Sequence, residues 1–129
     1  NLVNLQRHSS LIATTDTLVS DLYSQQNKAM VGDTEGRAST DTYGIHFDQN
    51  AYVLFHGTYS SSQPTNFVIN LDDSMEFDTA SRTEIIFEKG SGEAYQFSTG
   101  PDRVILRDTT NGDTKTIIFN RYGVITDIN

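Results

Sequence analysis

The stretch LIATTDTLVSDLYSQQNKAMVG, from Leu11 to Gly32, predicts one amphipathic helix that decides the fold. Apolar or small side chains recur in it at spacings of three and four, so they share one face of a helix. They are Leu11, Thr15, Leu18, Val19, Leu22, Ala29 and Met30. Gln25 and Gln26 interrupt this stripe. Gly32 stands where a left-handed C-cap is common, so we expect the helix to end near Val31.

The helix has a predicted end but no clear beginning, since residues 1–10 continue it backwards without an N-cap signal. A lone helix gains little from propensity, so its stripe needs an apolar partner, and the nearest is the strand-rich remainder. We therefore expect a helix at 1–31, with Leu18–Met30 on a sheet, and a β-rich head at 32–129. Residues 1–10 would be an exposed, frayed or bent end. The predicted core or assembly face consists of Leu11, Leu18, Leu22 and Met30.

Composition and charge exclude several classes of function. The 129 residues predict one domain, and they contain no cysteine, which excludes disulfides, thiolate metal sites and cysteine nucleophiles. The formal net charge of −8 repels a phosphate backbone, although six of the nine basic residues lie between Arg82 and Arg121 and leave a local basic face open. No run of about 18 apolar residues predicts a membrane span.

After Val31 the hydrophobic period changes from helical to alternating, and all nine glycines and both prolines lie beyond this point. The segment YGIHFDQNAYVLFHGTY, residues 43–59, predicts a hairpin whose turn centres on residues 49–50. That register pairs Phe47 with Tyr52, Ile45 with Leu54 and Tyr43 with His56. The predicted core side of the hairpin carries Tyr43, Ile45 and Phe47.

Further strands are predicted by short apolar runs with turn residues between them. They are residues 66–71, 75–77, 83–88, 93–98, 103–108, 115–120 and 124–128. The links are short, so neighbouring strands should pair antiparallel. The predicted fold class is α+β, with one long N-terminal helix packed on antiparallel sheet made of eight or nine strands.

No catalytic or metal-binding constellation can be assembled from the sequence. His46 and His56 fall in the hairpin on opposite faces, and His8 lies near the start of the helix. GxSxG, HExxH and GxxxxGK[ST] motifs are absent. We therefore predict no enzyme, no cofactor and no small-molecule substrate.

Two acidic segments offer oxygen ligands of the kind that calcium prefers. The segment LDDSMEFD supplies the candidate calcium ligands Asp72, Asp73, Glu76 and Asp78. A solvated turn between two short strands is the preferred interpretation. DTTNGD, residues 108–113, lacks the alternating ligands of an EF-hand loop, and its Asn-Gly pair favours a hairpin turn.

Three segments, in order, carry a resemblance to a known family. They are YGIHFDQNAYVLF (43–55), EIIFEKGSG (84–92) and KTIIFNRYGVI (115–125). With the preceding helix, they resemble type IV pilins and type II secretion pseudopilins, and most closely the GspH/FimT type of minor pseudopilin. Members of that type show a similar hairpin after the helix, a similar apolar strand and glycine turn in mid-chain, and a similar closing hairpin.

The resemblance implies a structural role without catalysis. Family members begin with a basic leader, a cleavage site and an apolar helix, and we expect the gene to encode such a segment directly before Asn1. The subunit would be anchored in the inner membrane by that helix and cut by a prepilin peptidase. It would then assemble with other pilin or pseudopilin subunits through helix packing, displaying an extracytoplasmic head that serves secretion or adhesion.

Two alternatives stay open beside this interpretation. Some FimT-like proteins bind DNA, and here the clustered basic candidates are Arg103, Arg107, Lys115 and Arg121. The acidic total argues against that alternative. A free-standing extracytoplasmic binding or adhesion module would instead show a ligand pocket lined with exposed aromatic side chains.

Overall fold

The computed structural model describes residues 2–129, with side chains from Ser10 onward, and shows one long helix and two antiparallel sheets. The helix is α1 (Leu2–Val31). The first sheet has the order β3 (Phe67–Asn70), β2 (Ala51–His56), β1 (Tyr43–Phe47) and β5 (Glu84–Phe87). The second has the order β4 (Met75–Phe77), β6 (Arg103–Asp108), β7 (Thr114–Phe119) and β8 (Ile125–Ile128). A 3-10 turn, η1 (Phe97–Thr99), precedes β6.

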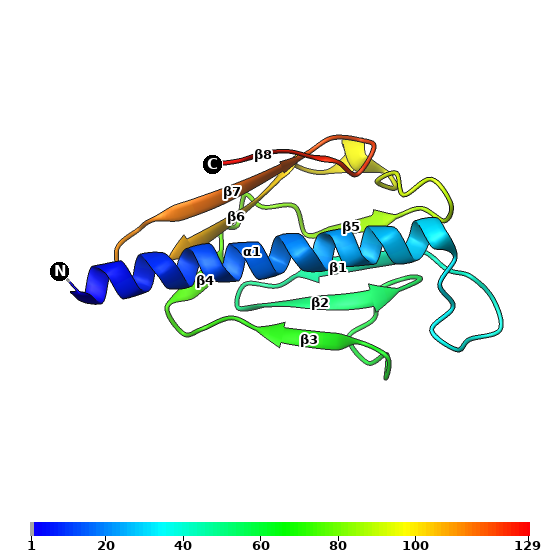
Figure 1. Ribbon diagram of the computed structural model, residues 1–129, viewed down its shortest axis with the longest axis horizontal. Helices are drawn as coiled ribbons and strands as arrows, with labels where there is room; N and C mark the ends of the chain where they lie inside the picture. Colours follow the sequence, from blue (N-terminus) through cyan, green and yellow to red (C-terminus); the bar gives the residue numbers. More distant parts are fainter. Residues whose placement is uncertain (1) are drawn as a thin grey trace.

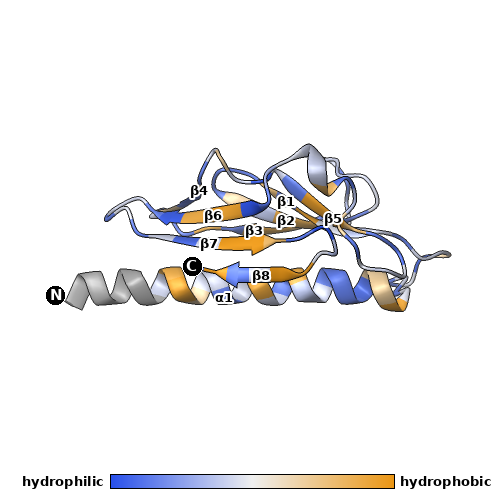
Figure 2. Ribbon diagram, turned by 90° about the horizontal axis from the view of Figure 1, so that it is seen from above, coloured by the Kyte–Doolittle hydropathy of each residue, from blue (hydrophilic) through white to orange (hydrophobic). Residues whose placement is uncertain are grey.

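The helix packs against both sheets. In Figure 1 it runs between β1–β3 on one side and β6–β8 on the other, and Figure 2 shows it along one side of the strand layer. It contacts β1 and β5 of the first sheet and β6 and β7 of the second. The predicted α+β class is confirmed. No helix within the described residues is long and apolar enough to cross a membrane.

The buried face of α1 follows a strict alternation of four and three residues. Its members are Leu11, Thr15, Leu18, Leu22, Gln25 and Ala29. The three leucines lie in one core cluster with residues from both sheets, among them Ile45, Ile85 and Ile117. Burying each leucine contributes roughly 1.5–3 kcal/mol, so this face is the main attachment of the helix to the head.

The interpretation of Gln25 and Gln26 as interruptions of the stripe is wrong. Gln25 is only 3% exposed, and its side-chain amide donates hydrogen bonds to the carbonyl oxygens of Gly44 (2.8 Å) and Phe55 (3.1 Å). Gln26 donates to the carbonyl oxygen of Gly92 (3.0 Å). A buried amide is tolerated because its donors are satisfied. Both glutamines therefore attach the helix to the head.

Met30 was predicted to share the core or assembly face with the three leucines, but it does not lie on the buried face, because its side chain is 48% exposed. The alternating spacing passes through Ala29, and Met30 lies about 100° further round the helix. Its side chain instead lies against the turn at Gly92, where an added Cβ would stand only 2.6 Å from Met30 Cγ. The prediction for residues 1–10 falls almost wholly outside the described side chains.

The end of the helix is as predicted. Gly32 adopts a left-handed conformation with φ of 71°, which carries no steric cost for glycine. The Asp33 N–H then donates to the carbonyl of Lys28 at 3.0 Å, the long-range bond of a Schellman motif. The chain thus leaves α1 at Val31.

The predicted hairpin is confirmed with its register. Phe47 pairs with Tyr52, Ile45 with Leu54 and Tyr43 with His56. Tyr43, Ile45 and Phe47 are buried and face the helix side. The other face of the hairpin carries Val53 and Phe55, which are also buried.

Seven of the other strand predictions can be compared with the structure, and one is wrong. Residues 93–98 form only a bridge at Ala94 and the start of η1. The cause is Arg82, whose buried guanidinium donates hydrogen bonds to the carbonyl oxygens of Phe97 (2.8 Å) and Pro101 (2.9 Å). A buried cation needs such partners, so the backbone curls around it. The remaining six strands lie where they were predicted, with small changes at their ends.

Substituting Leu18→Ala should lower the free energy of unfolding by about 2–5 kcal/mol, because it leaves a cavity where α1 meets the core. Ser20→Ala is the matched control on the exposed face of the same helix and should change it by less than about 0.5 kcal/mol. Urea unfolding followed by circular dichroism measures both variants. Equal, small effects would contradict the packing of this face.

Candidate functional site

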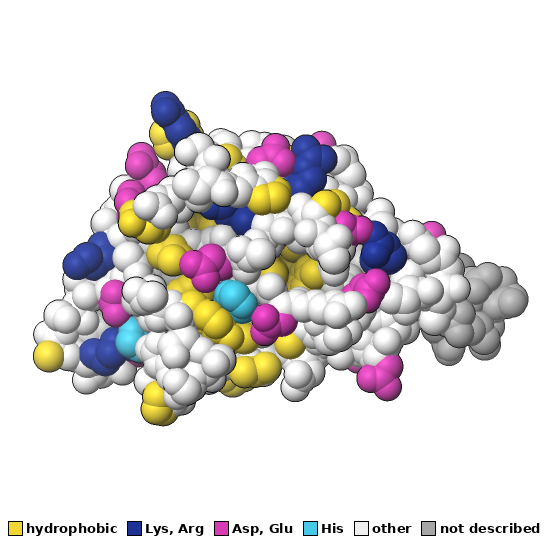
Figure 3. Space-filling model, turned by 180° about the vertical axis from the view of Figure 1, so that it is seen from behind, with side chains coloured by type: hydrophobic (Ala, Val, Ile, Leu, Met, Phe, Trp, Pro, Cys, Tyr) yellow, Lys and Arg dark blue, Asp and Glu magenta, His cyan; other side chains and the backbone are white. Residues whose placement is uncertain are grey.

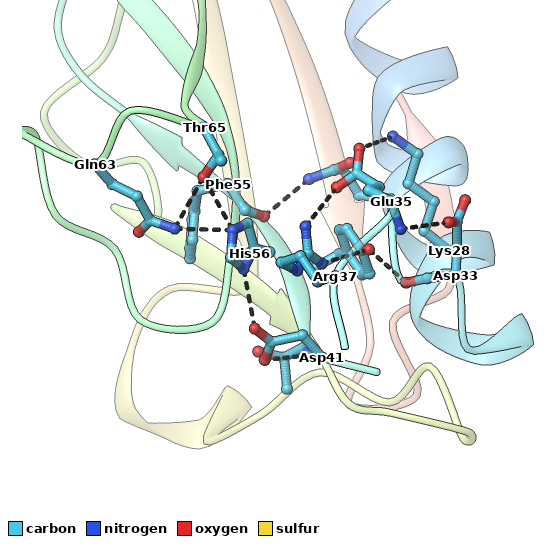
Figure 4. Close-up of polar contacts among 12 residues, drawn as sticks. Lys28, Asp33, Glu35, Arg37, Asp41, Phe55, His56, Gln63 and Thr65 are labelled. Carbon is cyan, nitrogen blue, oxygen red and sulfur yellow. Dashed lines mark hydrogen bonds and ion pairs between the residues drawn. The ribbon is translucent and has the colours of Figure 1, made fainter. Parts of the chain in front are cut away.

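A polar cluster lies where α1 ends and the loops of residues 32–42 and 57–66 meet the ends of β1 and β2 (Figure 4). Figure 4 shows side chains from the helix, from both loops and from β2 converging there. The first loop turns sharply because Glu35 and Gly36 both have positive φ. This conformation brings Asp33, Glu35 and Arg37 back against Tyr43 at the start of β1.

Tyr43 is the centre of one half of the cluster. Its hydroxyl donates to the carbonyl of Asp33 (2.5 Å) and accepts a hydrogen bond from Arg37 (2.7 Å). Arg37 also contacts Glu35 at 3.3 Å, and Glu35 contacts Lys28 of α1 at 3.3 Å. Burial raises the pKa of Tyr43 above its ordinary value, although Arg37 opposes this shift. The hydroxyl therefore stays protonated and ties the loop to the sheet.

His56 is the centre of the other half. Its Nδ1 lies 2.9 Å from Asp41, and its Nε2 lies 2.9 Å from the Thr65 hydroxyl and 3.0 Å from the Gln63 amide nitrogen. An amide NH₂ can only donate, so Nε2 accepts, and Nδ1 carries the ring proton and donates a hydrogen bond to the Asp41 carboxylate. Burial acts to raise the pKa of Asp41, but hydrogen bonds from His56 and the Thr42 N–H outweigh it and hold this pKa below its ordinary value.

Asp41, His56 and Thr65 have the connectivity of a hydrolytic triad, with acid, imidazole and hydroxyl in line. Gln63 competes with that chemistry. Its amide donates to the same imidazole nitrogen that would have to take the proton from Thr65, and also to Thr65 itself at 3.1 Å. The arrangement is suited to holding the loop of residues 57–66 against β2 and not to activating a nucleophile.

A hollow of about 280 Å³ opens beside this cluster, between α1 and the outer strand β3. Its apolar lining includes Leu54 and Phe67, and its polar lining includes Lys28, His56 and Thr65. Phe67 is 64% exposed. The hollow combines an apolar floor with a few polar groups, which is the usual character of a small binding site.

His46 lies on the opposite face of the hairpin, as the sequence predicted. Its ring stacks on Tyr59 with centroids 3.8 Å apart, while its nitrogens lie near Asp48 (3.1 Å) and Glu84 (3.3 Å). The two histidines thus hold the loop of residues 57–66 from different sides of the first sheet. His8 lies outside the described side chains. Among the side chains from Ser10 onward, no group of three or more metal-ligating residues could hold a metal ion.

The four candidate calcium ligands do not converge. Glu76 and Asp78 both contact Arg107, whose positive charge offsets one of their two negative charges. Asp72 accepts a hydrogen bond from Ser10 of α1 at 3.2 Å, and Asp73 is exposed. The segment is a turn that leads into β4, in agreement with the preferred interpretation. Residues 108–113 likewise form the hairpin turn between β6 and β7.

The basic candidates do not form one face. Arg103 contacts Asp102 at 2.8 Å, Arg107 contacts Glu76 and Asp78, and Arg121 contacts the Tyr122 hydroxyl. Lys115 pairs in register with Leu106, at a position facing the helix side of its sheet. Figure 3 shows basic and acidic side chains interspersed on the rear face of the molecule. This arrangement offers no continuous basic groove on that face.

Sequence reasoning did not find the cluster around Tyr43 and His56. One signal was available, because the predicted register already placed Tyr43 opposite His56 and so brought Asp41 near the imidazole. Comparisons with protein-family models, curated proteins and solved structures gave no match.

Asp41→Asn should lower the free energy of unfolding near neutral pH by roughly 1 kcal/mol or less, since Asp41 is partly exposed. A carboxyl whose pKa is lowered in the folded state stabilises the fold at pH values above its pKa in the unfolded chain. This stabilisation is lost as the pH falls, so the stability difference between the variant and the wild type should shrink below about pH 4. Urea unfolding at pH 7 and pH 3 measures it. Asp73→Asn, at an exposed position, is the control. If Asp41→Asn differs more from the wild type at pH 3 than at pH 7, the lowered pKa of Asp41 is contradicted.

Proposed function

We propose that this chain is a structural minor subunit of a type IV pilus or type II secretion pseudopilus, without catalysis, whose head is displayed outside the cytoplasm. The observation that carries the proposal is the division of α1 into two faces. One face is buried on the head, and the opposite face is uncovered from Ile12 to Val31. The helix rises about 1.5 Å per residue, so the uncovered face from Ile12 to Val31 is an extended surface about 30 Å long.

The uncovered face has the character of a helix-packing surface. It presents small side chains at Ala13, Thr17, Ser20 and Ser24, which follow one another at spacings of three and four. Small residues let the backbones of two helices approach closely. Exposed Ile12 and Tyr23 add apolar contact area on the same helix. Neighbouring subunits could therefore pack along α1 while the sheets stay outside.

The segments that resemble minor pseudopilins support the same proposal. Residues 43–55 form the β1–β2 hairpin, residues 84–87 form β5, and residues 115–125 lead from β7 into β8. Each segment is thus a structural unit of the head. The half of the cluster around Tyr43 has a role in this proposal, because it fixes the loop of residues 32–42 that connects α1 to the head.

The hollow beside Phe67 favours a second candidate, a free-standing extracytoplasmic binding or adhesion module. Such a module would use the exposed aromatic ring and the apolar floor to hold a ligand. DNA capture is less well supported, because three of the four basic candidates contact acidic or phenolic groups. These two functions do not require the uncovered face of α1.

Single-cysteine variants test the filament proposal cleanly, because the native chain has no cysteine. The full-length gene product carrying Ser20→Cys or Ser24→Cys is expressed in its own organism and treated with a short bismaleimide crosslinker. We expect a ladder of adducts with other subunits in the sheared surface fraction or the membrane fraction. Asn111→Cys, in the exposed β6–β7 turn, is the control and should give no ladder.

The outcome that would contradict the proposal is equally direct. If neither helix variant forms adducts while the protein is released freely into the medium, α1 does not pack against neighbouring subunits. The binding-module candidate would then account better for the structure.

A further inference from the structure

The chain covers the edge of β5 with its own backbone and side chains. The outward carbonyl oxygen of Ile86 accepts a hydrogen bond from the Tyr95 N–H (2.8 Å), and the Glu88 N–H donates to the carbonyl of Glu93 (2.8 Å). Arg82 Nε donates to the carbonyl of Glu84 at 2.8 Å. This edge is therefore closed to pairing with another chain.

In the second sheet, the edge of β4 is also covered, and the edge of β8 is protected in part. On β4, the outward N–H of Phe77 donates to the carbonyl of Gln49 (2.9 Å), and the N–H of Met75 donates to the carbonyl of Asp72 (2.9 Å). On β8, the outward N–H of Ile128 donates to the side chain of the adjacent Asp127 (2.9 Å). A charged side chain and an irregular register both hinder pairing at an edge strand, and β8 has both, in Asp127 and in its register shift against β7 at Ile118/Phe119.

The edge of β3 is different. Its register with β2 pairs Phe67 with Leu54 and Ile69 with Tyr52, and the Leu71 N–H donates to the carbonyl of Asn50. Hydrogen-bonded positions alternate along an antiparallel pair, so the N–H and C=O groups of Val68 and Asn70 point away from the sheet. Within the described residues, no backbone or side chain covers these groups as it does on the edges of β4 and β5.

The side chains of β3 are apolar and largely uncovered. Phe67 is 64% exposed on the helix side, Val68 is 53% exposed on the other side, and no residue of the strand is charged. Two hollows lie between α1 and this strand. The first is the 280 Å³ hollow at Phe67, and the second, of about 310 Å³, is lined by Thr14, Tyr52 and Ile69 among others.

We propose that the β3 edge binds an extended segment of a partner polypeptide by strand addition. The segment pairs its backbone with Val68 and Asn70 and places apolar side chains, four residues apart, over the two hollows. Residues four apart on a strand are about 13 Å from one another, which matches the separation between Phe67, which lines the first hollow, and Leu71, which lines the second. Backbone pairing gives the affinity and the hollows give the selectivity.

Charge indicates the rest of the partner's chemistry. The chain has a formal net charge of −8, and the exposed carboxylates of Asp72 and Asp73 follow directly after β3. A basic residue at one end of the added segment would meet them. The backbone pairing at Val68 and Asn70 takes place on the head and does not depend on the filament proposal, although Ala13 and Thr17 of the uncovered face of α1 also line the second hollow.

The test uses two synthetic peptides and the folded chain. One peptide alternates valine and threonine between flanking lysines, and its twin carries an N-methyl group on every residue between the lysines, which blocks backbone pairing through both edges of the peptide. In a ¹⁵N–¹H NMR titration, the first peptide should shift the amides of Val68 and Asn70 saturably, and the twin should not. Equal shifts with both peptides, or shifts centred on β8, would overturn the proposal.

Matched variants locate the binding. Val68→Pro removes an N–H that makes no bond to β2, so the fold should tolerate it, and peptide affinity should fall about tenfold or more. Val68→Thr keeps the N–H and should stay within about threefold of wild type. Unchanged affinity in Val68→Pro would overturn the proposal. The proposal would also be overturned if the wild-type chain formed a dimer without peptide and Val68→Pro abolished that dimer, because the edge would then pair with a second copy of the chain.

Discussion

The burial of one face of α1 against both sheets is the interaction on which the rest of the structure depends. Each sheet has only four strands, and the two meet the helix with different elements, β1 and β5 on one side and β6 and β7 on the other. Leu18 and Leu22 belong to a cluster that contains residues from both sheets. The helix therefore joins the sheets into one core.

Polar contacts fix the position of the helix along the sheets. Apolar packing alone would let the helix slide. Gln25 reaches the backbone of β1 and β2, and Gln26 reaches the turn at Gly92. Tyr52 donates to Asp21 of α1 at 2.7 Å, and burial raises the pKa of this tyrosine well above its ordinary value. Directional bonds to backbone groups specify one register, whereas leucines accept several.

Much of this fold could be predicted from the sequence because the features concerned are determined by residues that are close together in the chain. The helix end at Gly32, the hairpin register and most strands follow from period and turn chemistry. Three features could not be predicted because they depend on distant partners: the burial of Gln25, the exposure of Met30, and the curl of residues 93–98 around Arg82. The cluster at His56 depends likewise on loops whose return to the sheet has no sequence period.

Native-state hydrogen exchange of the Leu22→Ala variant tests most directly whether α1 joins the two sheets. The amide of Ile45 reports on the first sheet and that of Ile117 on the second, and both lie in the core. The account predicts that the free energy of exchange falls equally at both amides, within about 0.5 kcal/mol. If either sheet keeps its wild-type protection while α1 loses its own, the helix is peripheral and the account is wrong.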